Sequence, residues 1–125
     1  MHRPIPENVL RFIQTSIPSV WTLELLFLMR RSPERAWTPR EIDRELRSSE
    51  LVVAGALARL IAAGLVIEES EGRFCYRPAR PDLSDLVDTL ARFHAEFPFA
   101  VVQAILAAPN QQIRTFADAF RIKKD

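Results

Sequence analysis

The sequence predicts a mainly helical domain with one short β-hairpin near its middle and further helices after it. Apolar residues recur at spacings of three and four through most of the chain, as they do on the buried face of a helix. Between residues 65 and 76 this spacing gives way to two short apolar runs on either side of a turn, as in a hairpin. The length of 125 residues and the hydrophobic content of 48% fit one domain, or one domain with an appendage.

Two helices are expected before the first strong break in the pattern. Residues 6–15 present an apolar face, and Pro6 suits a first helical turn. Ser19 can cap the second helix through its side-chain oxygen. Arg30 and Arg31 lie in the expected last turn, where positive charge complements the helix dipole.

The clearest local signal is the motif TPRE at 38–41. A threonine cap, a proline at the first helical position and a glutamate three residues after the cap form a capping box. Ile42 and Leu46 give this helix one buried edge, and it is expected to end near Arg47. The helix is therefore short, with room for only a tight turn after it.

A second helix is expected directly after that turn. Ser48 or Ser49 can cap it, and Gly64 supplies its end. Its core side is predicted to hold Val53, Leu57, Leu60 and Ile61. Two strands then follow, at 65–67 and 74–76, and Trp37 is placed where a short extra strand would pair with them. Helix, turn, helix and hairpin in this order predict a winged helix-turn-helix with a two-stranded wing.

The region after the hairpin is expected to form additional C-terminal helices. Asp82 can cap the first, whose apolar stripe comprises Leu83, Leu86, Val87, Leu90, Phe93 and Phe97. Pro98 restarts the chain for a further helix, and Asn110 can cap a last one that carries Ile113, Phe116 and Phe120. We therefore divide the chain into a winged domain with its N-terminal helix at 1–80 and a helical extension at 81–125. The stripe is either a dimer seam or an inner face packed on the winged domain, because periodicity reports burial without naming the partner.

Several classes of function find no support in the composition. The single Cys75 and the two histidines, His2 and His94, cannot build a disulfide framework or a metal site of the usual kind. Three isolated glycines make no phosphate-binding loop, and no nucleophile has a base near it in sequence. No apolar run reaches the ~18–20 residues that span a bilayer. We expect a cytoplasmic protein that is no enzyme, binds no cofactor and enters no membrane.

The segment from Thr38 to Val66, TPREIDRELRSSELVVAGALARLIAAGLV, resembles the helix-turn-helix of MarR-type winged-helix transcription regulators. With the wing included, the resemblance covers residues 38–77. It implies a homodimer that binds duplex DNA and regulates transcription, with the helix that follows Ser49 in the major groove. The candidate DNA-contacting residues are then Arg40, Arg44, Arg47, Ser49, Arg59, Arg73 and Arg77. A second arginine cluster, Arg30, Arg31 and Arg35, is a further candidate for phosphate contact.

The recognition helix departs from what DNA recognition usually needs. Base edges and phosphates call for hydrogen-bond donors, yet only Ser49 and Arg59 supply them well, and Glu50 repels phosphate. The formal net charge of the chain is only +1, whereas nucleic-acid binders are usually basic. An alternative is therefore a protein–protein interaction module whose contact face includes Leu51, Val52, Ala54 and Gly55. Exposure of residues 50–58 beside arginines would favour DNA, and burial under residues 99–120 would favour the interaction module.

Overall fold

The computed structural model describes residues 5–107 of the chain. These residues form six helices and one two-stranded antiparallel sheet, which confirms the predicted winged helix-turn-helix with helices after the wing. The elements are α1 (Glu7–Ser16), α2 (Val20–Arg31), α3 (Pro39–Leu46), α4 (Glu50–Ala62), β1 (Val66–Ser70), β2 (Arg73–Tyr76), α5 (Pro81–Glu96) and α6 (Pro98–Ala107). The last expected helix, with Ile113, Phe116 and Phe120, lies outside the described residues.

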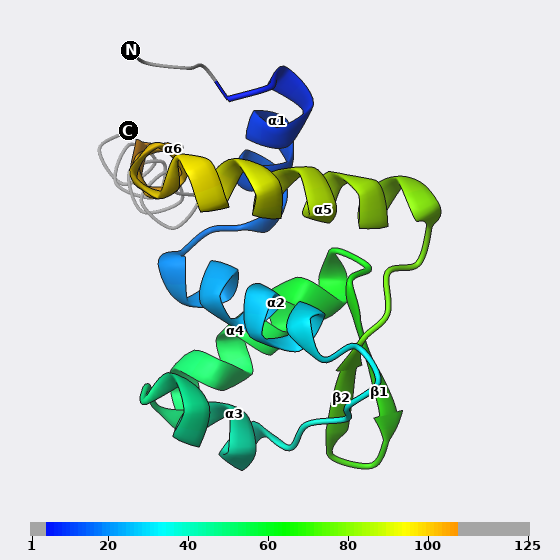
Figure 1. The fold of residues 1–125 in the computed structure, drawn as a ribbon. Coiled ribbons are helices and arrows are strands. Elements are labelled where there is room, and N and C mark those ends of the chain that lie inside the picture. The colour runs from blue at the N-terminus through cyan, green and yellow to red at the C-terminus, as the bar shows by residue number, and fades with distance from the viewer. Residues whose placement is uncertain (1–4, 108–125) are drawn as a thin grey trace, which may run out of the picture.

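The helices form two groups that lie one above the other in Figure 1. The lower group holds α2, α3, α4 and the hairpin, with α2 packed on α4. In the upper group, α5 runs across the top of the molecule and α1 packs against both α5 and α6. The N-terminal helix thus lies with the C-terminal helices in space, although it belongs to the winged segment in sequence. One hydrophobic core runs through both groups.

The turn between α3 and α4 has the geometry that the sequence predicts. The Thr38 hydroxyl accepts from the Glu41 N–H at 3.2 Å, and the Glu41 carboxylate accepts from the Thr38 N–H at 2.9 Å, which completes the capping box. After α3 the backbone of Arg47 turns left-handed, with φ of 53°. Ser49 then caps α4 by accepting from the Val52 N–H at 3.2 Å. Two short helices therefore cross at a three-residue turn.

Gly64 connects the end of α4 to the wing. It adopts φ of 79°, and its N–H donates to the Ile61 carbonyl while Leu65 N–H donates to the Leu60 carbonyl, both at 3.0 Å. This pair of bonds ends α4 in a Schellman motif. In the hairpin that follows, Ile67 pairs with Cys75. Trp37 and Phe74 exchange backbone hydrogen bonds of 2.7 and 2.8 Å, so the expected extra strand is present as a single bridge.

Two sequence predictions for helix faces and ends are wrong. Ile61 was expected in the core but is 42% exposed, because it lies at the edge of the buried face and Ala56 takes the inner place. Asp82 was expected to cap α5, but the helix starts one residue earlier, with Arg80 at the cap position and Pro81 in the first turn. A proline favours this position because it has no N–H to leave unpaired there.

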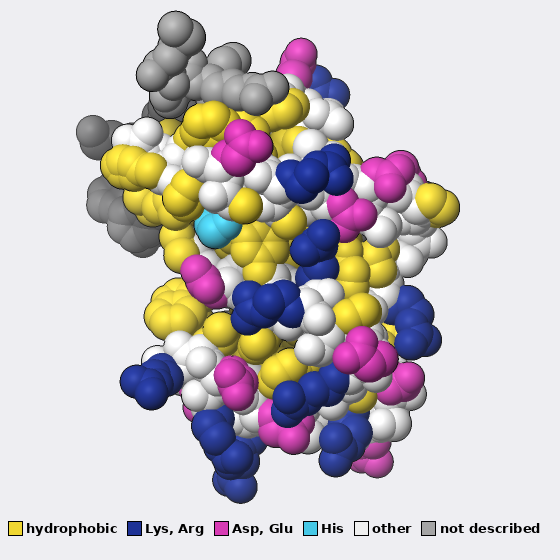
Figure 2. Space-filling model, viewed as in Figure 1, with side chains coloured by type: hydrophobic (Ala, Val, Ile, Leu, Met, Phe, Trp, Pro, Cys, Tyr) yellow, Lys and Arg dark blue, Asp and Glu magenta, His cyan; other side chains and the backbone are white. Residues whose placement is uncertain are grey.

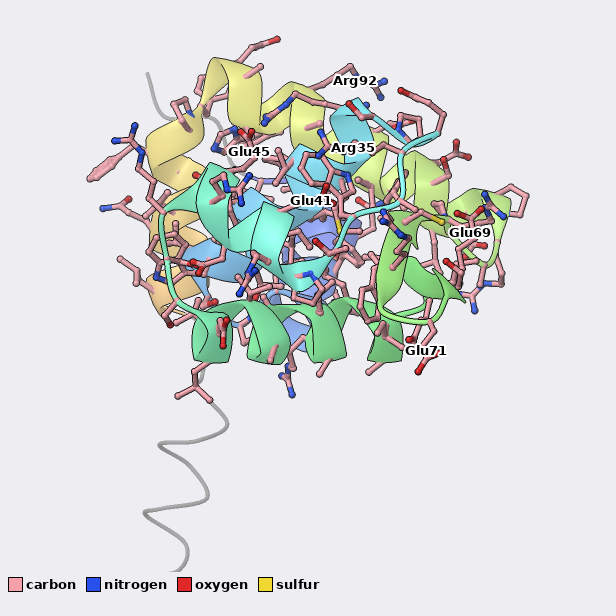
Figure 3. The ribbon with its side chains drawn as sticks, turned by 90° about the horizontal axis from the view of Figure 1, so that it is seen from below. Arg35, Glu41, Glu45, Glu69, Glu71 and Arg92 are labelled. Atoms are coloured by element: carbon pink, nitrogen blue, oxygen red, sulfur yellow. The ribbon has the colours of Figure 1, made fainter. Side chains whose placement is uncertain are left out.

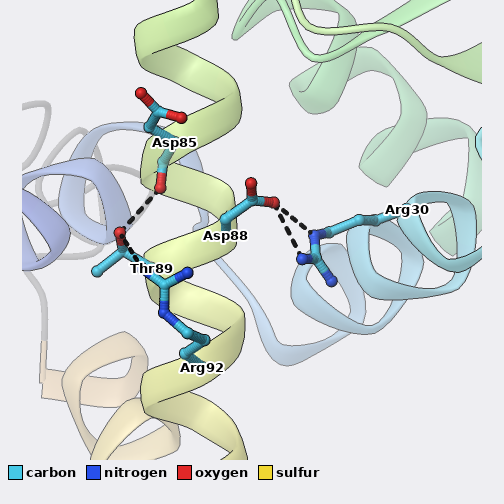
Figure 4. A network of polar contacts seen from close by, with 5 residues as sticks. All are labelled: Arg30, Asp85, Asp88, Thr89 and Arg92. Carbon is cyan, nitrogen blue, oxygen red and sulfur yellow. Dashed lines mark hydrogen bonds and ion pairs between the residues drawn. The ribbon is translucent and has the colours of Figure 1, made fainter.

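Helix α5 is tied to α2 by an ion pair. Arg30 donates from Nε and Nη2 to one carboxylate oxygen of Asp88, at 3.1 and 2.9 Å (Figure 4). On the neighbouring side of α5, the Thr89 hydroxyl donates to the Asp85 carbonyl at 2.9 Å and accepts from Arg92 at 3.4 Å. The partly exposed pair contributes little energy by itself, and it connects two helices that are far apart in the sequence.

Aromatic side chains fill the rest of this junction. The rings of Phe27 and His94 meet at 5.0 Å between centroids in a tilted arrangement. Tyr76, at the end of β2, is buried, and burial raises its pKa, with the nearby Asp88 carboxylate adding to the effect and Arg30 opposing it. Aromatic contacts and the buried Tyr76 thus help to join the two groups of helices.

No helix within residues 5–107 is by itself both long enough and apolar enough to cross a membrane. Two helix pairs, each sharply bent at its break, pass that test only when the two members are taken together.

Candidate nucleic-acid interface

Helix α4 presents one face to the core and leaves the opposite face open. The buried residues are Val53, Ala56, Leu57 and Leu60. Leu51 is 85% exposed, the highest exposure of any large hydrophobic side chain in the described residues. Also exposed are Ser49, Glu50, Ala54, Gly55, Ala58 and Arg59, and Val52 is half-buried. Helix α6 lies at the other end of the molecule and does not cover this face (Figure 1).

Three arginines form a ridge along the outside of α3. Arg40, Arg44 and Arg47 are exposed, and their spacing of four and three puts them opposite the buried Ile42. In the described part of the chain none of the three makes an ion pair. Figure 3 shows α3 from below, beside α4 and the wing, with Glu41 and Glu45 labelled on α3 and Glu69 and Glu71 on the wing. The three guanidinium groups are therefore available to a ligand.

Arg47 occupies an unusual backbone position for a residue with a side chain. Its φ of 53° is the left-handed conformation, and elsewhere in residues 5–107 only Gly64 and Gly72 have positive φ. For a residue other than glycine this conformation costs about 1–2 kcal/mol. The chain thus keeps a large cation in the turn between α3 and α4, where glycine would be the less costly residue.

The wing provides one arginine that is free of ion pairs and one that is not. Arg77 pairs with Glu69 at 3.7 Å, whereas Arg73 is exposed and makes no ion pair with any described residue. At the tip, the Glu68 carboxylate accepts from the Gly72 N–H at 2.9 Å and so stabilises the turn. The wing therefore offers Arg73 as its principal cation.

The second arginine cluster of the sequence does not point to a common ligand. Arg30 is held by Asp88, as described above. Arg35 stacks 3.5 Å above the Trp37 ring and lies 3.7 Å from Glu41. Only Arg31 stays exposed and without an ion pair in the described residues.

Glu41 is committed to the start of α3. The N–H of Thr38 donates to its carboxylate, and this hydrogen bond holds the pKa of Glu41 below its ordinary value, with Arg35 and Arg73 acting in the same direction. The carboxylate therefore stays ionised at neutral pH and neutralises part of the charge of those arginines. The ridge formed by Arg40, Arg44 and Arg47 lies on another side of the helix.

Positive and negative charges are mixed over this end of the molecule. Residues 38–77 contain six arginines and seven carboxylates. Figure 2 shows dark blue and magenta side chains interspersed at the lower end, around α3 and the wing. The surface therefore has discrete points for phosphate contact and no broad positive field.

The apolar stripe of α5 belongs mainly to the inside of this chain. Leu83, Val87 and Leu90 are buried, and the half-buried members are Leu86, Phe93 and Phe97. Of the two interpretations of the stripe, this burial favours the inner face over a dimer seam. A partner could reach the three buried residues only if α5 moved away from its own core.

The sequence analysis overlooked an exposed apolar face on α6. Phe99 is 64% exposed and Leu106 74% exposed, and α6 contains no charged residue. Yellow side chains gather at this end of the molecule, at the upper left in Figure 2. The spacing of seven between these two residues signals a shared helix face, but the pattern alone gives no means to tell an outer apolar face from an inner one.

Comparison with known proteins gives no relative: no family model matches the chain, and no curated protein or solved structure is significantly similar to it.

Proposed function

We propose that this chain is a non-catalytic, cytoplasmic transcription regulator that binds duplex DNA as a homodimer. The observation that carries the proposal is the open outer face of α4, exposed from Ser49 to Arg59 beside the arginine ridge of α3. A helix presented in this way fits the major groove, whose width admits one α-helix. The resemblance of residues 38–77 to MarR-type regulators supports the same interpretation.

In the proposed complex, backbone contacts position the protein. Arg40, Arg44 and Arg47 would bind phosphates along one side of the groove, and Arg73 would bind a phosphate on the side of the wing. Arg59 lies further along α4 and supplies a fifth cation. Charged hydrogen bonds of this kind set the register of a protein on DNA without reading the sequence. Arg77 contributes less in this scheme, because Glu69 already neutralises it.

The conformation of Arg47 supports a role for its side chain. A left-handed arginine reduces the stability of the fold relative to glycine. A cation at this turn lies between α3 and the start of α4, where the chain would approach the DNA backbone. In the proposed complex, the Arg47 side chain makes a phosphate contact, although its left-handed backbone lowers the stability of the fold.

The dimer is proposed to form through α6 rather than through the α5 stripe. Phe99 and Leu106 present an apolar face, and the uncharged α6 would meet a second copy without like charges opposite each other. A two-fold axis through this face would relate two copies of α4, one for each half of a palindromic DNA site.

Binding to a pool of random duplexes, measured by fluorescence anisotropy across a series of salt concentrations, tests the proposal. Five phosphate contacts in each protomer predict a slope of log K against log salt of about −4.5 for one bound protomer and about −9 for the dimer, since each contact contributes about −0.9. We expect the protein to bind duplex DNA at low salt and to lose this binding at high salt. If no duplex binds at low salt, the proposal is wrong.

A second candidate function is a protein–protein interaction module that uses the same face of α4. It is favoured by the balanced charge of residues 38–77 and by the apolar character of Leu51, Val52, Ala54 and Gly55. A Cβ at Gly55 would have no neighbouring atom within 4 Å outside the helix's own backbone, and the position is exposed, so Gly55→Arg should leave the fold intact. This function predicts that Gly55→Arg abolishes association with a protein partner or with a second copy. A variant that behaves like the wild type in pull-down and sizing experiments would exclude it.

A further inference from the structure

We infer that α4 reads DNA mainly through the C5-methyl groups of thymine, by apolar contact in the major groove, rather than by hydrogen bonds to purines. The inference rests on the proposed DNA binding and specifies which chemical group on the DNA this face recognises.

The exposed face offers few groups for the usual hydrogen-bonded readout. Guanine presents only acceptors in the major groove, and adenine presents an acceptor beside its amino group, so bidentate recognition of either needs a donor. Leu51, Ala54 and Ala58 have no donor. Glu50 is acceptor-only when it is ionised. The Ser49 hydroxyl accepts from the Val52 N–H and has a single O–H left to donate, so it cannot make a bidentate contact. Arg59, about two and a half turns from the start of the helix, is the one strong donor on this face of α4.

The same side chains suit the one apolar group on the floor of the groove. The thymine methyl is recognised by apolar side chains such as alanine. Leu51, with 85% of its surface exposed, is the most exposed large hydrophobic side chain of residues 5–107. At Gly55 nothing lies within 4 Å of the place that a Cβ would take, so the backbone of α4 is open to close approach at that point. Leu51 and Ala54 on one side of Gly55, and Ala58 on the other, would then reach methyl groups of successive bases.

The charges around this face favour DNA over a protein as its occupant. Arg40, Arg44 and Arg47 are exposed on the neighbouring helix, and Arg73 is exposed on the wing. They make no ion pair with other described residues. An apolar strip bordered by free guanidinium groups is complementary to a groove whose floor carries methyl groups and whose two edges are phosphates. Glu50 fits the same surface as an acceptor for the amino group of cytosine.

The test uses a duplex selected for tight binding from a random pool at low salt, and the same duplex with uracil in place of thymine. Uracil lacks only the methyl group, so every hydrogen bond and every phosphate stays the same. We expect affinity to fall about fourfold for each contacted thymine, because burying one such carbon group is worth about 0.8 kcal/mol. The salt slope should not change, since the phosphate contacts are not altered. Uracil placed outside the bound region is the control and should have no effect.

Leu51→Ser provides the matched protein variant. Because the position is exposed, the variant should fold like the wild type, and thermal unfolding checks this directly. The ratio of affinities for the thymine and uracil duplexes should move toward one in the variant, while its binding remains sensitive to salt. Equal affinity of the wild type for both duplexes overturns the inference and leaves DNA binding standing. No binding to any duplex at low salt overturns the proposed function, and this inference with it.

Discussion

Two helices of this molecule expose apolar faces, but their surroundings differ. Helix α4 leaves Leu51 in solvent beside the arginines of α3 and the wing, whereas α6 leaves Phe99 and Leu106 in solvent and contains no charged residue. An exposed apolar patch alone indicates only that something binds there. The charges beside each patch are the basis of the two proposed partners, a phosphate-bearing ligand at α4 and an uncharged protein surface at α6.

Because the two faces have different surroundings, substitutions at α4 and on α6 should have different effects. Changes at the border of α4 should act on binding to DNA and on its dependence on salt. Changes on α6 should act on the oligomeric state and leave the salt dependence of a bound protomer unchanged. If the two faces respond in the same way to both kinds of change, the comparison fails.

The largest effect is expected from removing the arginine ridge. The triple variant Arg40→Gln, Arg44→Gln, Arg47→Gln should lose about a thousandfold in affinity for DNA per bound protomer, because each charged hydrogen bond is worth about 1.5 kcal/mol or more. The slope of log K against log salt should become shallower by about three per bound protomer. Anisotropy titrations at several salt concentrations measure both quantities.

A matched triple variant elsewhere on the surface controls for net charge. Arg11, Arg80 and Arg92 are exposed arginines on α1, at the start of α5 and on α5, outside the arginine ridge of α3 and the exposed face of α4. Replacing them by glutamine removes the same total charge, and affinity should change by less than about threefold, as expected for distant, screened charges. An equal loss in both variants would mean that overall charge, and not the ridge, determines binding.

Substitutions on the two exposed apolar faces should affect different properties: self-association for α6 and DNA binding for α4. Phe99→Glu combined with Leu106→Glu should weaken self-association at least about thirtyfold, the effect of losing an apolar anchor worth 2 kcal/mol. Leu51→Glu places the same charge on α4 and should leave the dimer intact while it weakens DNA binding. Sedimentation velocity and anisotropy give the two measurements. A dimer that persists in the α6 variant contradicts the assignment of that face.

Arg47→Gly should lower the affinity for DNA without lowering the stability of the fold. Glycine adopts the left-handed turn without cost, so the free energy of unfolding should be unchanged or raised by up to about 1 kcal/mol. Affinity for DNA should nevertheless fall about tenfold, because one charged phosphate contact is lost. Chemical denaturation and anisotropy test the two parts. Unchanged affinity would show that the arginine does not reach DNA.

Most of the fold was predictable because its signals are local. The capping box at Thr38 and Glu41, the serine caps and the glycine that ends α4 each depend on residues within one helical turn. The winged arrangement then follows from the order of these elements. Ile61 was misplaced because a residue at the edge of a helix face is turned in or out by its neighbours in space, and periodicity does not contain that information.

The candidate site was predictable only in part. Arginines at the right spacing could be picked from the sequence, but the ion pairs that engage Arg30, Arg35 and Arg77 depend on carboxylates brought together by the fold. Among these, Asp88 is 58 residues away from Arg30. The burial of Leu83, Val87 and Leu90, and the exposure of α6, depend likewise on how the two groups of helices pack.

The smallest predicted effect concerns acid, and it compares the starts of two helices. The pKa of Glu41 is lowered by its hydrogen bond from Thr38 at the start of α3, and the pKa of Asp82 is lowered by its hydrogen bond from Arg80 at the start of α5. Because each carboxylate has a lower pKa in the folded state, each stabilises the fold at pH values above its unfolded pKa. That contribution disappears as the pH falls through the folded pKa.

Glu41→Gln isolates the contribution of α3. Glutamine keeps an oxygen that can accept from the Thr38 N–H, but it does not titrate. The wild type should therefore be more stable than the variant at neutral pH, and the difference should shrink as the pH falls below 4.5, the ordinary value for this carboxyl. Urea unfolding of both proteins at pH 7 and pH 3 measures this difference, and NMR titration follows Glu41 and Asp82 separately. A difference that grows in acid would contradict the sign of the pKa shift.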